Sequence, residues 1–112
     1  MREDGKIDYV EMPGGELPAV KAFYTAAFGW KFTDYGPTYA AYSEGLDGGF
    51  QGDAPPSATP LLVLYASDLE AMLASVRAAG GHVLREPYAF PGDRRFHFRD
   101  PAGNELAVWS SA

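Results

Sequence analysis

The sequence contains no cysteine. This absence excludes disulfide bonds, thiolate metal sites, iron–sulfur clusters and a cysteine nucleophile. Basic residues are also scarce, because 9 lysines and arginines stand against 15 aspartates and glutamates, which gives a net charge of −6. Since an acidic chain repels the phosphate backbone, we expect no nucleic-acid partner.

Long apolar segments are missing as well. No run approaches the about 18 consecutive apolar residues of a membrane-spanning helix, and the first six residues lack the apolar stretch of a secretory signal. We therefore expect a cytoplasmic protein without a membrane partner. The chain does have an ordinary globular composition, with 46% hydrophobic and 21% charged residues among its 112. One compact domain with a single core is the expectation for this length.

An internal repeat with an offset of 52 residues is the first informative pattern. Six of the thirteen positions in 17–29 are identical to those in 69–81: Leu17/Leu69, Ala19/Ala71, Ala22/Ala74, Ala26/Ala78, Ala27/Ala79 and Gly29/Gly81. Two unrelated alanine-rich helices are the alternative, but a short predicted strand precedes each segment, over 7–12 and 61–66. We therefore predict two copies of one module, over about 6–53 and 60–110, joined by a proline-rich linker over 53–60.

Each copy has the pattern of a strand, a helix and three strands. Helices are predicted over 16–28 and from Ser67, as N-cap with Glu70 completing a capping box, to the Gly80-Gly81 pair. Further strands are predicted over 30–34, 39–43, 49–52, 82–86, 94–99 and 105–109. The order βαβββ, twice, predicts an α+β fold in which tandem modules form a curved mixed sheet around a groove. Such a groove is a natural small-molecule site.

Four short motifs occur along the chain in a characteristic order and spacing. They are Ile7-x-Tyr9-x-Glu11-Met12-Pro13, Phe23-Tyr24-x-x-x-Phe28-Gly29-Trp30, Ala78-Ala79-Gly80-Gly81 and Asp100-Pro101-x-Gly103-Asn104. Between residues 7 and 109 the chain thereby resembles the vicinal oxygen chelate superfamily, which includes glyoxalase I, bleomycin-resistance proteins and extradiol dioxygenases. The resemblance implies a single glyoxalase-like domain of tandem βαβββ modules, often assembled as a homodimer.

The same resemblance implies where a metal would be bound, and this sequence departs from that pattern. The positions of the family's two histidines and its glutamate fall at Tyr9, Leu61 and Ala107, and on the fourth strand only Gln51 offers a suitable oxygen. A tyrosine phenol titrates near 10, and leucine and alanine side chains have no donor atom. Because of this departure from the pattern of the family, we expect a protein with no metal and no cofactor.

Strand alternation supplies a candidate ligand site. The side chains expected to face the groove are Tyr9, Glu11, Gln51, Tyr65, Glu105 and Trp109. An aromatic and mildly acidic groove suits a flat or cationic organic ligand. Alternatively, each aromatic ring fills the core or a dimer interface, and each carboxylate reaches water or an arginine. His97 is an acid/base candidate only if its face is the groove.

Three functions remain open, and no residue is assigned a catalytic role. The first is a metal-free small-molecule-binding protein, with a role in sequestration or resistance or as an accessory protein. The second is a divalent-metal-dependent lyase or dioxygenase with unusual ligands such as Glu11, Gln51, Glu105 or His97. The third is a metal-free acid/base enzyme built on Glu11 or His97. A homodimer is expected, because aromatic residues such as Trp109, Phe28 and Trp30 require cover.

Overall fold

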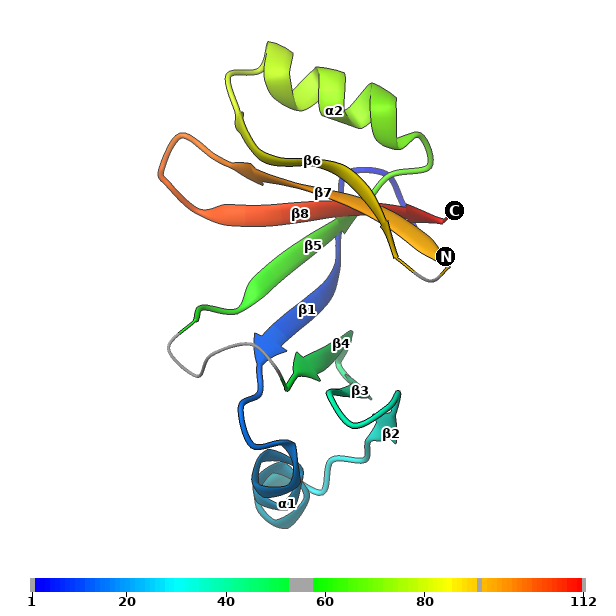
Figure 1. Cartoon of the computed structure of the whole chain (residues 1–112), viewed down its shortest axis with the longest axis vertical. Helices are drawn as coiled ribbons and strands as arrows, with labels where there is room; N and C mark the ends of the chain where they lie inside the picture. Colours follow the sequence, from blue (N-terminus) through cyan, green and yellow to red (C-terminus); the bar gives the residue numbers. More distant parts are fainter. Residues whose placement is uncertain (1, 53–57, 91, 112) are drawn as a thin grey trace. The chain divides into compact units, whose positions relative to one another are not determined.

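The computed structural model describes residues 2–52, 58–90 and 92–111. Its element order confirms the predicted double βαβββ repeat (Figure 1). The elements are β1 (Ile7–Pro13), α1 (Leu17–Phe28), β2 (Thr33–Asp34), β3 (Tyr39–Glu44), β4 (Leu46–Gln51), β5 (Leu61–Tyr65), α2 (Leu69–Ala78), β6 (His82–Phe90), β7 (Asp93–Arg99) and β8 (Glu105–Ser111). Residues 53–57 of the predicted linker lie outside the described residues.

The chain divides into two compact units, which we call module A (Tyr9–Leu61) and module B (Met1–Asp8 with Leu62–Ala112). Module A has the strand order β2-β3-β4-β1, in which β1 and β4 are parallel and the other pairs antiparallel. Module B has the order β5-β8-β7-β6, in which β5 and β8 form the parallel pair. The repeat seen in the sequence is thus a repeat of topology.

Helix α1 covers one face of the module A strands. It begins one residue later than predicted, has Pro18 in its first turn, and ends at Gly29, which has the left-handed φ of 73° that glycine tolerates best. The core of module A consists of four buried residues with five partly buried ones packed around them. The buried residues are Leu17, Ala40, Tyr42 and Phe50, and the others are Met12, Val20, Tyr24, Trp30 and Phe32. Five of the ten aromatic residues of this module therefore belong to the core or pack against it.

Helix α2 begins differently from the prediction. Asp68, rather than Ser67, is the N-cap, and its carboxylate accepts a hydrogen bond from the Ala71 amide at 3.1 Å. Ser67 is engaged elsewhere, because its amide and hydroxyl both donate to the Asp4 carboxylate, at 2.9 and 3.0 Å. The predicted capping box was wrong for this reason. The same contacts attach the N-terminal segment to module B.

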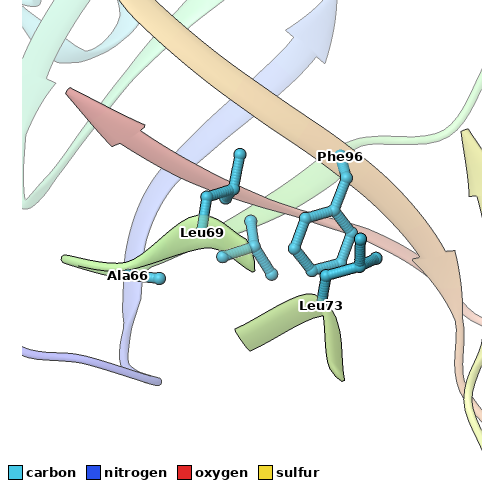
Figure 2. Close-up of a cluster of buried hydrophobic side chains, with 5 residues drawn as sticks. Ala66, Leu69, Leu73 and Phe96 are labelled. Atoms are coloured by element: carbon cyan, nitrogen blue, oxygen red, sulfur yellow. The ribbon is translucent and has the colours of Figure 1, made fainter. Parts of the chain in front are cut away.

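The core of module B lies between α2 and the strands. Leu69 and Leu73 of α2 pack with Ala66 against Phe96 of β7, as Figure 2 shows, and Val108 of β8 completes the cluster. Phe96 is fully buried. Because side chains alternate along a strand, the neighbours of Phe96 in β7, Arg95 and His97, belong to the opposite face.

Strand β6 is four residues longer than predicted and contains two irregularities. Its pairing with β7 shifts register between Val83 and Arg85 and again between Arg85 and Tyr88, so that Arg85 pairs with His97 and Tyr88 with Arg95. Residues 85 and 88 have opposite parity, and a regular strand would place them on opposite faces. The extra residue of a bulge places both on the face of His97.

No described helix is long and apolar enough to cross a membrane.

Truncation of the central core residue should have a large effect on stability. Phe96→Ala is expected to lower the free energy of unfolding by about 3–5 kcal/mol, since it removes buried apolar area and leaves a cavity. Urea denaturation followed by circular dichroism measures this loss. The control is Leu46→Ala, whose side chain is 50% exposed and which should cost about 1 kcal/mol or less. Equal losses for the two variants would contradict the assigned core.

Candidate functional site

A pocket of about 550 Å³ opens in module A. Its walls are formed by residues of β1, β3, β4 and the segment around β2. Lining residues are Tyr9, Lys31, Phe32, Thr33, Tyr35, Tyr39, Ala41, Tyr42, Ser43, Glu44, Asp47 and Gly48. Four of these are tyrosines, two are carboxylates and one is a lysine, so the pocket combines aromatic surface with a net negative charge.

A hydrogen-bonded chain of three side chains borders this pocket. The Tyr9 and Tyr39 hydroxyls are hydrogen-bonded, and the Tyr39 hydroxyl donates to Oε2 of Glu11 at 3.3 Å. A phenol has one proton, and the Glu11 carboxylate only accepts. The Tyr39 hydroxyl therefore donates its hydrogen bond to Glu11 and accepts one from the Tyr9 hydroxyl.

The Tyr39 side chain reaches the other two residues by crossing β4 at a glycine. Tyr39 lies on β3, whereas Tyr9 and Glu11 lie on β1, and Gly49 of β4 is the partner of Glu11. A Cβ atom on Gly49 would stand 2.2 Å from the Tyr39 hydroxyl. The absence of a side chain at Gly49 is thus what allows the contact.

Burial fixes the protonation of two phenols in this module. It raises the pKa of Tyr39 far above the ordinary value of a phenol, and hydrogen bonding to Tyr9 and the charge of Glu11 raise it further. Burial likewise raises the pKa of Tyr42 to about 12, and the Tyr42 hydroxyl donates to the Val10 carbonyl at 3.1 Å. Both groups therefore act as neutral hydrogen-bond donors and not as bases.

The structure brings together two of the predicted site residues of module A. Tyr9 and Glu11 are joined through Tyr39, which sequence analysis missed, although the Gly48-Gly49 pair in a strand was a signal of close side-chain approach. Gln51 lies at the end of β4 opposite Pro13 and Tyr39, and its backbone carbonyl accepts from the Gly14 amide at 2.9 Å. Of these three predicted residues, only Tyr9 is among the described residues that line the pocket.

Tyr65 and Trp109 lie together in module B. They are cross-strand partners, with ring centroids 5.3 Å apart at an interplanar angle of 68°. The Trp109 indole donates to Oδ2 of Asp8 at 2.9 Å, and the Arg2 guanidinium carbon lies 5.0 Å from the Trp109 ring. The chain's own cation therefore covers the predicted stacking surface of Trp109.

Glu105 lies beside a histidine. Its Oε2 is 3.1 Å from Nδ1 of His97, and the Tyr88 hydroxyl is 2.8 Å from Nε2 of the same ring. Burial lowers the pKa of His97, with Arg95 and Arg85 also lowering it, while the hydrogen bond to Glu105 opposes this shift. The sequence did not point to Tyr88 as a partner, because the predicted strand ended at residue 86, before Tyr88, whereas β6 continues to Phe90.

The resemblance places the metal positions of the family at Tyr9, Leu61 and Ala107, and these side chains form a poor set of metal ligands. Ala107 and Leu61 have no donor atom, and the Tyr9 hydroxyl is hydrogen-bonded to Tyr39. Within residues 2–52, 58–90 and 92–111, no group of three or more histidine, cysteine, aspartate or glutamate side chains could hold a metal ion.

The contact across Gly49 can be tested by a double-mutant cycle. Gly49→Ala should displace the Tyr39 ring, break its hydrogen bonds to Tyr9 and Glu11, and lower the free energy of unfolding by about 1–3 kcal/mol. In a Tyr39→Ala background the ring is gone, so the same substitution should cost much less. Urea denaturation of the four proteins measures the coupling. An equal cost of Gly49→Ala in both backgrounds would show that the ring does not occupy this position.

Comparison with known proteins places this geometry in a family. The family model of the Glyoxalase/Bleomycin resistance protein/Dioxygenase superfamily matches residues 6–108, whereas no curated protein matches the chain by sequence. Similar solved structures include an NAD-dependent benzaldehyde dehydrogenase from Legionella pneumophila (TM-score 0.76, 14% identity, 93% of this chain and 98% of that chain). A methylmalonyl-CoA epimerase variant from Streptomyces coelicolor with bound 2-nitronate-propionyl-CoA is also similar (0.69, 19%, 98% and 99%). So is a glyoxalase/bleomycin resistance protein/dioxygenase superfamily member from Vibrio splendidus 12B01 (0.70, 14%, 95% and 98%).

At these identities the structural similarity shows the fold alone, and it agrees with the match of the family model. The chain belongs to the glyoxalase, bleomycin-resistance protein and dioxygenase superfamily.

Proposed function

We propose that this superfamily member is a metal-free protein that binds a flat organic cation in the module A pocket. The observation that carries the proposal is the composition of the pocket walls, in which Tyr9, Tyr35, Tyr39 and Tyr42 stand with Glu44 and Asp47. The volume of about 550 Å³ is within the usual range for small-molecule sites. The complex of the similar epimerase with an acyl-CoA ligand is consistent with a fold that accommodates small organic molecules.

The chemistry of the walls favours a cation over an anion. Phenol faces attract positive charge through their quadrupole. Of the two carboxylates, Asp47 accepts from the Ser43 hydroxyl at 2.7 Å, and Glu44 accepts from the Lys31 amide at 3.1 Å. Both bonds orient a carboxylate and leave its charge in place. Sequestration of such a ligand is the role that a binding site without a catalytic metal supports best.

Binding without a metal is part of the proposal. It is supported by the donor chemistry of Tyr9, Leu61 and Ala107, two of which have no ligating atom. Elemental analysis of the protein used for binding separates it from the metal-dependent alternative. We expect no stoichiometric metal, because these side chains offer too few ligands. About one tightly held transition metal per chain would contradict the metal-free proposal.

The cationic preference can be tested with a matched pair of probes. Benzamidine is a planar cation, and benzamide is a neutral molecule of nearly the same shape. We expect benzamidine to bind more tightly, as measured by chemical-shift perturbation of Ser43, Ala41 and Gly48 amides. Asp47→Asn should weaken benzamidine binding by up to about fivefold, because an exposed charge pair contributes about 0.2–1 kcal/mol, and should leave benzamide binding unchanged.

The matched control for this test is Asp34→Asn. Asp34 is an exposed carboxylate of the same module that pairs with Lys21 at 2.8 Å and is not among the lining residues. The control should leave the affinity for benzamidine unchanged. Equal affinity for the two probes, or perturbations confined to module B, would overturn the proposed ligand class and site.

We also infer that the chain forms a homodimer. The support is exposed aromatic surface on α1, where Phe23 is 57% and Phe28 is 65% exposed, since apolar patches of this kind are usually covered. Trp30, in contrast, packs against the module A core, and Trp109 is partly covered by Arg2. Sedimentation equilibrium at micromolar concentration should give twice the chain mass, and Phe28→Ser should shift the protein toward monomer. A monomer mass for the unchanged protein would contradict the inference.

A further inference from the structure

Three side chains from three adjacent strands of module B form a continuous hydrogen-bonded row. Tyr88 comes from β6, His97 from β7 and Glu105 from β8. The Tyr88 hydroxyl lies 2.8 Å from Nε2 of His97, and Nδ1 of His97 lies 3.1 Å from Oε2 of Glu105. The tyrosine and histidine rings are stacked, with an interplanar angle of 21°. A potential nucleophile, a base and a group that orients the base are thus in contact.

The protons in this row follow from the chemistry of its members. An ionised carboxylate only accepts hydrogen bonds, so Nδ1 of His97 carries a proton and donates it to Glu105. The His97 side chain is only 12% exposed, and burial keeps its pKa below the ordinary value. The ring is therefore neutral at neutral pH, and its Nε2 accepts the hydrogen bond from Tyr88. This is the arrangement in which a histidine is ready to take a phenol proton.

Positive charge flanks the tyrosine. The Arg85 guanidinium lies 3.6 Å from the Tyr88 ring centroid, and Arg95 is the cross-strand partner of Tyr88. Glu105 is the acidic group of the row, and its side chain is half exposed. In a chain of net charge −6, two arginines next to one phenol favour a reaction in which negative charge develops near that phenol.

We propose that Tyr88, His97 and Glu105 form a second, acyl-accepting site on module B, with Tyr88 as nucleophile, His97 as base and Glu105 as the positioning residue. Its substrates are small activated esters. The Tyr88 oxygen forms a bond to the carbonyl carbon, the ester C–O bond breaks, and the phenol proton passes to Nε2 of His97 and then to the departing alkoxide or phenolate. The pairing of nucleophile and oriented base is the general signature of nucleophilic catalysis. This activity is separate from ligand binding in module A.

The test uses p-nitrophenyl acetate as the probe. Acetylation releases p-nitrophenolate, which is followed by absorbance, and peptide mass spectrometry locates the acetyl group. Tyr35 is the internal control, because it is 66% exposed and no histidine is paired with it among the residues that the structure describes. We expect Tyr88, although less exposed, to be acetylated about tenfold faster than Tyr35 or more, since a positioned base typically contributes at least that factor.

Variants assign the individual roles. Tyr88→Phe should abolish acetylation at this position, His97→Asn should reduce the rate at Tyr88 to that of Tyr35 or below, and Glu105→Gln should reduce it about tenfold. His82→Asn is the matched control: it removes the other, exposed histidine and should leave the rate unchanged. Long-range ¹H–¹⁵N correlation spectra should show the His97 proton on Nδ1. In Glu105→Gln a smaller fraction of His97 should carry its proton on Nδ1.

Two results would overturn the proposal. One is acetylation of Tyr88 no faster than that of Tyr35. The other is a rate at Tyr88 that neither His97→Asn nor Glu105→Gln changes. If His97→Asn fails to fold, as judged by circular dichroism, Glu105→Gln decides alone, because the Glu105 side chain is half exposed. Benzamidine binding in module A should be unchanged by Tyr88→Phe, His97→Asn and Glu105→Gln, so failure of one proposal is distinguishable from failure of the other.

Discussion

The parallel pairing of the first and last strands of each module is the constraint on which the rest of the structure depends. In module A, β4 returns beside β1, and in module B, β8 returns beside β5. Parallel neighbours cannot be joined by a tight turn, so the chain between them must cross over. The helix and two further strands provide that crossover, and the helix covers one face of each set of strands. The opposite face is then available for polar and aromatic side chains.

This division of faces explains why core and site can alternate along one strand. On β1, Met12 packs against the module A core, whereas Tyr9 and Glu11 contact Tyr39. On β7, Phe96 is part of the module B core, whereas His97 contacts Tyr88 and Glu105. A site built on strands in this way is held by the same hydrogen-bond ladders that hold the core, which limits its motion.

The two modules share topology but differ in the chemistry of the exposed-side groups. Module A presents the neutral phenol of Tyr39, held as a hydrogen-bond donor by burial, together with Glu44 and Asp47. Module B presents a neutral histidine between a phenol and a carboxylate, flanked by Arg85. The same topology therefore carries two different local environments, which we propose hold a cation in module A and move a proton in module B.

The sequence by itself determined the element order and the repeat. The apolar stripe of α2 and the alternation that puts Phe96 and Val108 under it were both visible as periodicity, because burial requires those residues to recur at fixed spacing. The membership of the family was visible in its short motifs. The expectation that Tyr9, Leu61 and Ala107 replace the metal ligands of the family used only residue identities and the resemblance.

The partners of the site residues were decided only by the tertiary structure. Tyr39 meets Tyr9 and Glu11 across Gly49 because the register of β3, β4 and β1 aligns them, and register across strands is not encoded locally. Asp68 rather than Ser67 caps α2, because the Ser67 amide and hydroxyl donate to the carboxylate of Asp4, more than sixty residues earlier in the chain. Tyr88 reaches His97 because a bulge in β6 reverses the parity of its side chains. One inserted residue changes the face of every residue that follows it, and sequence periodicity alone does not show where a strand will accept that insertion.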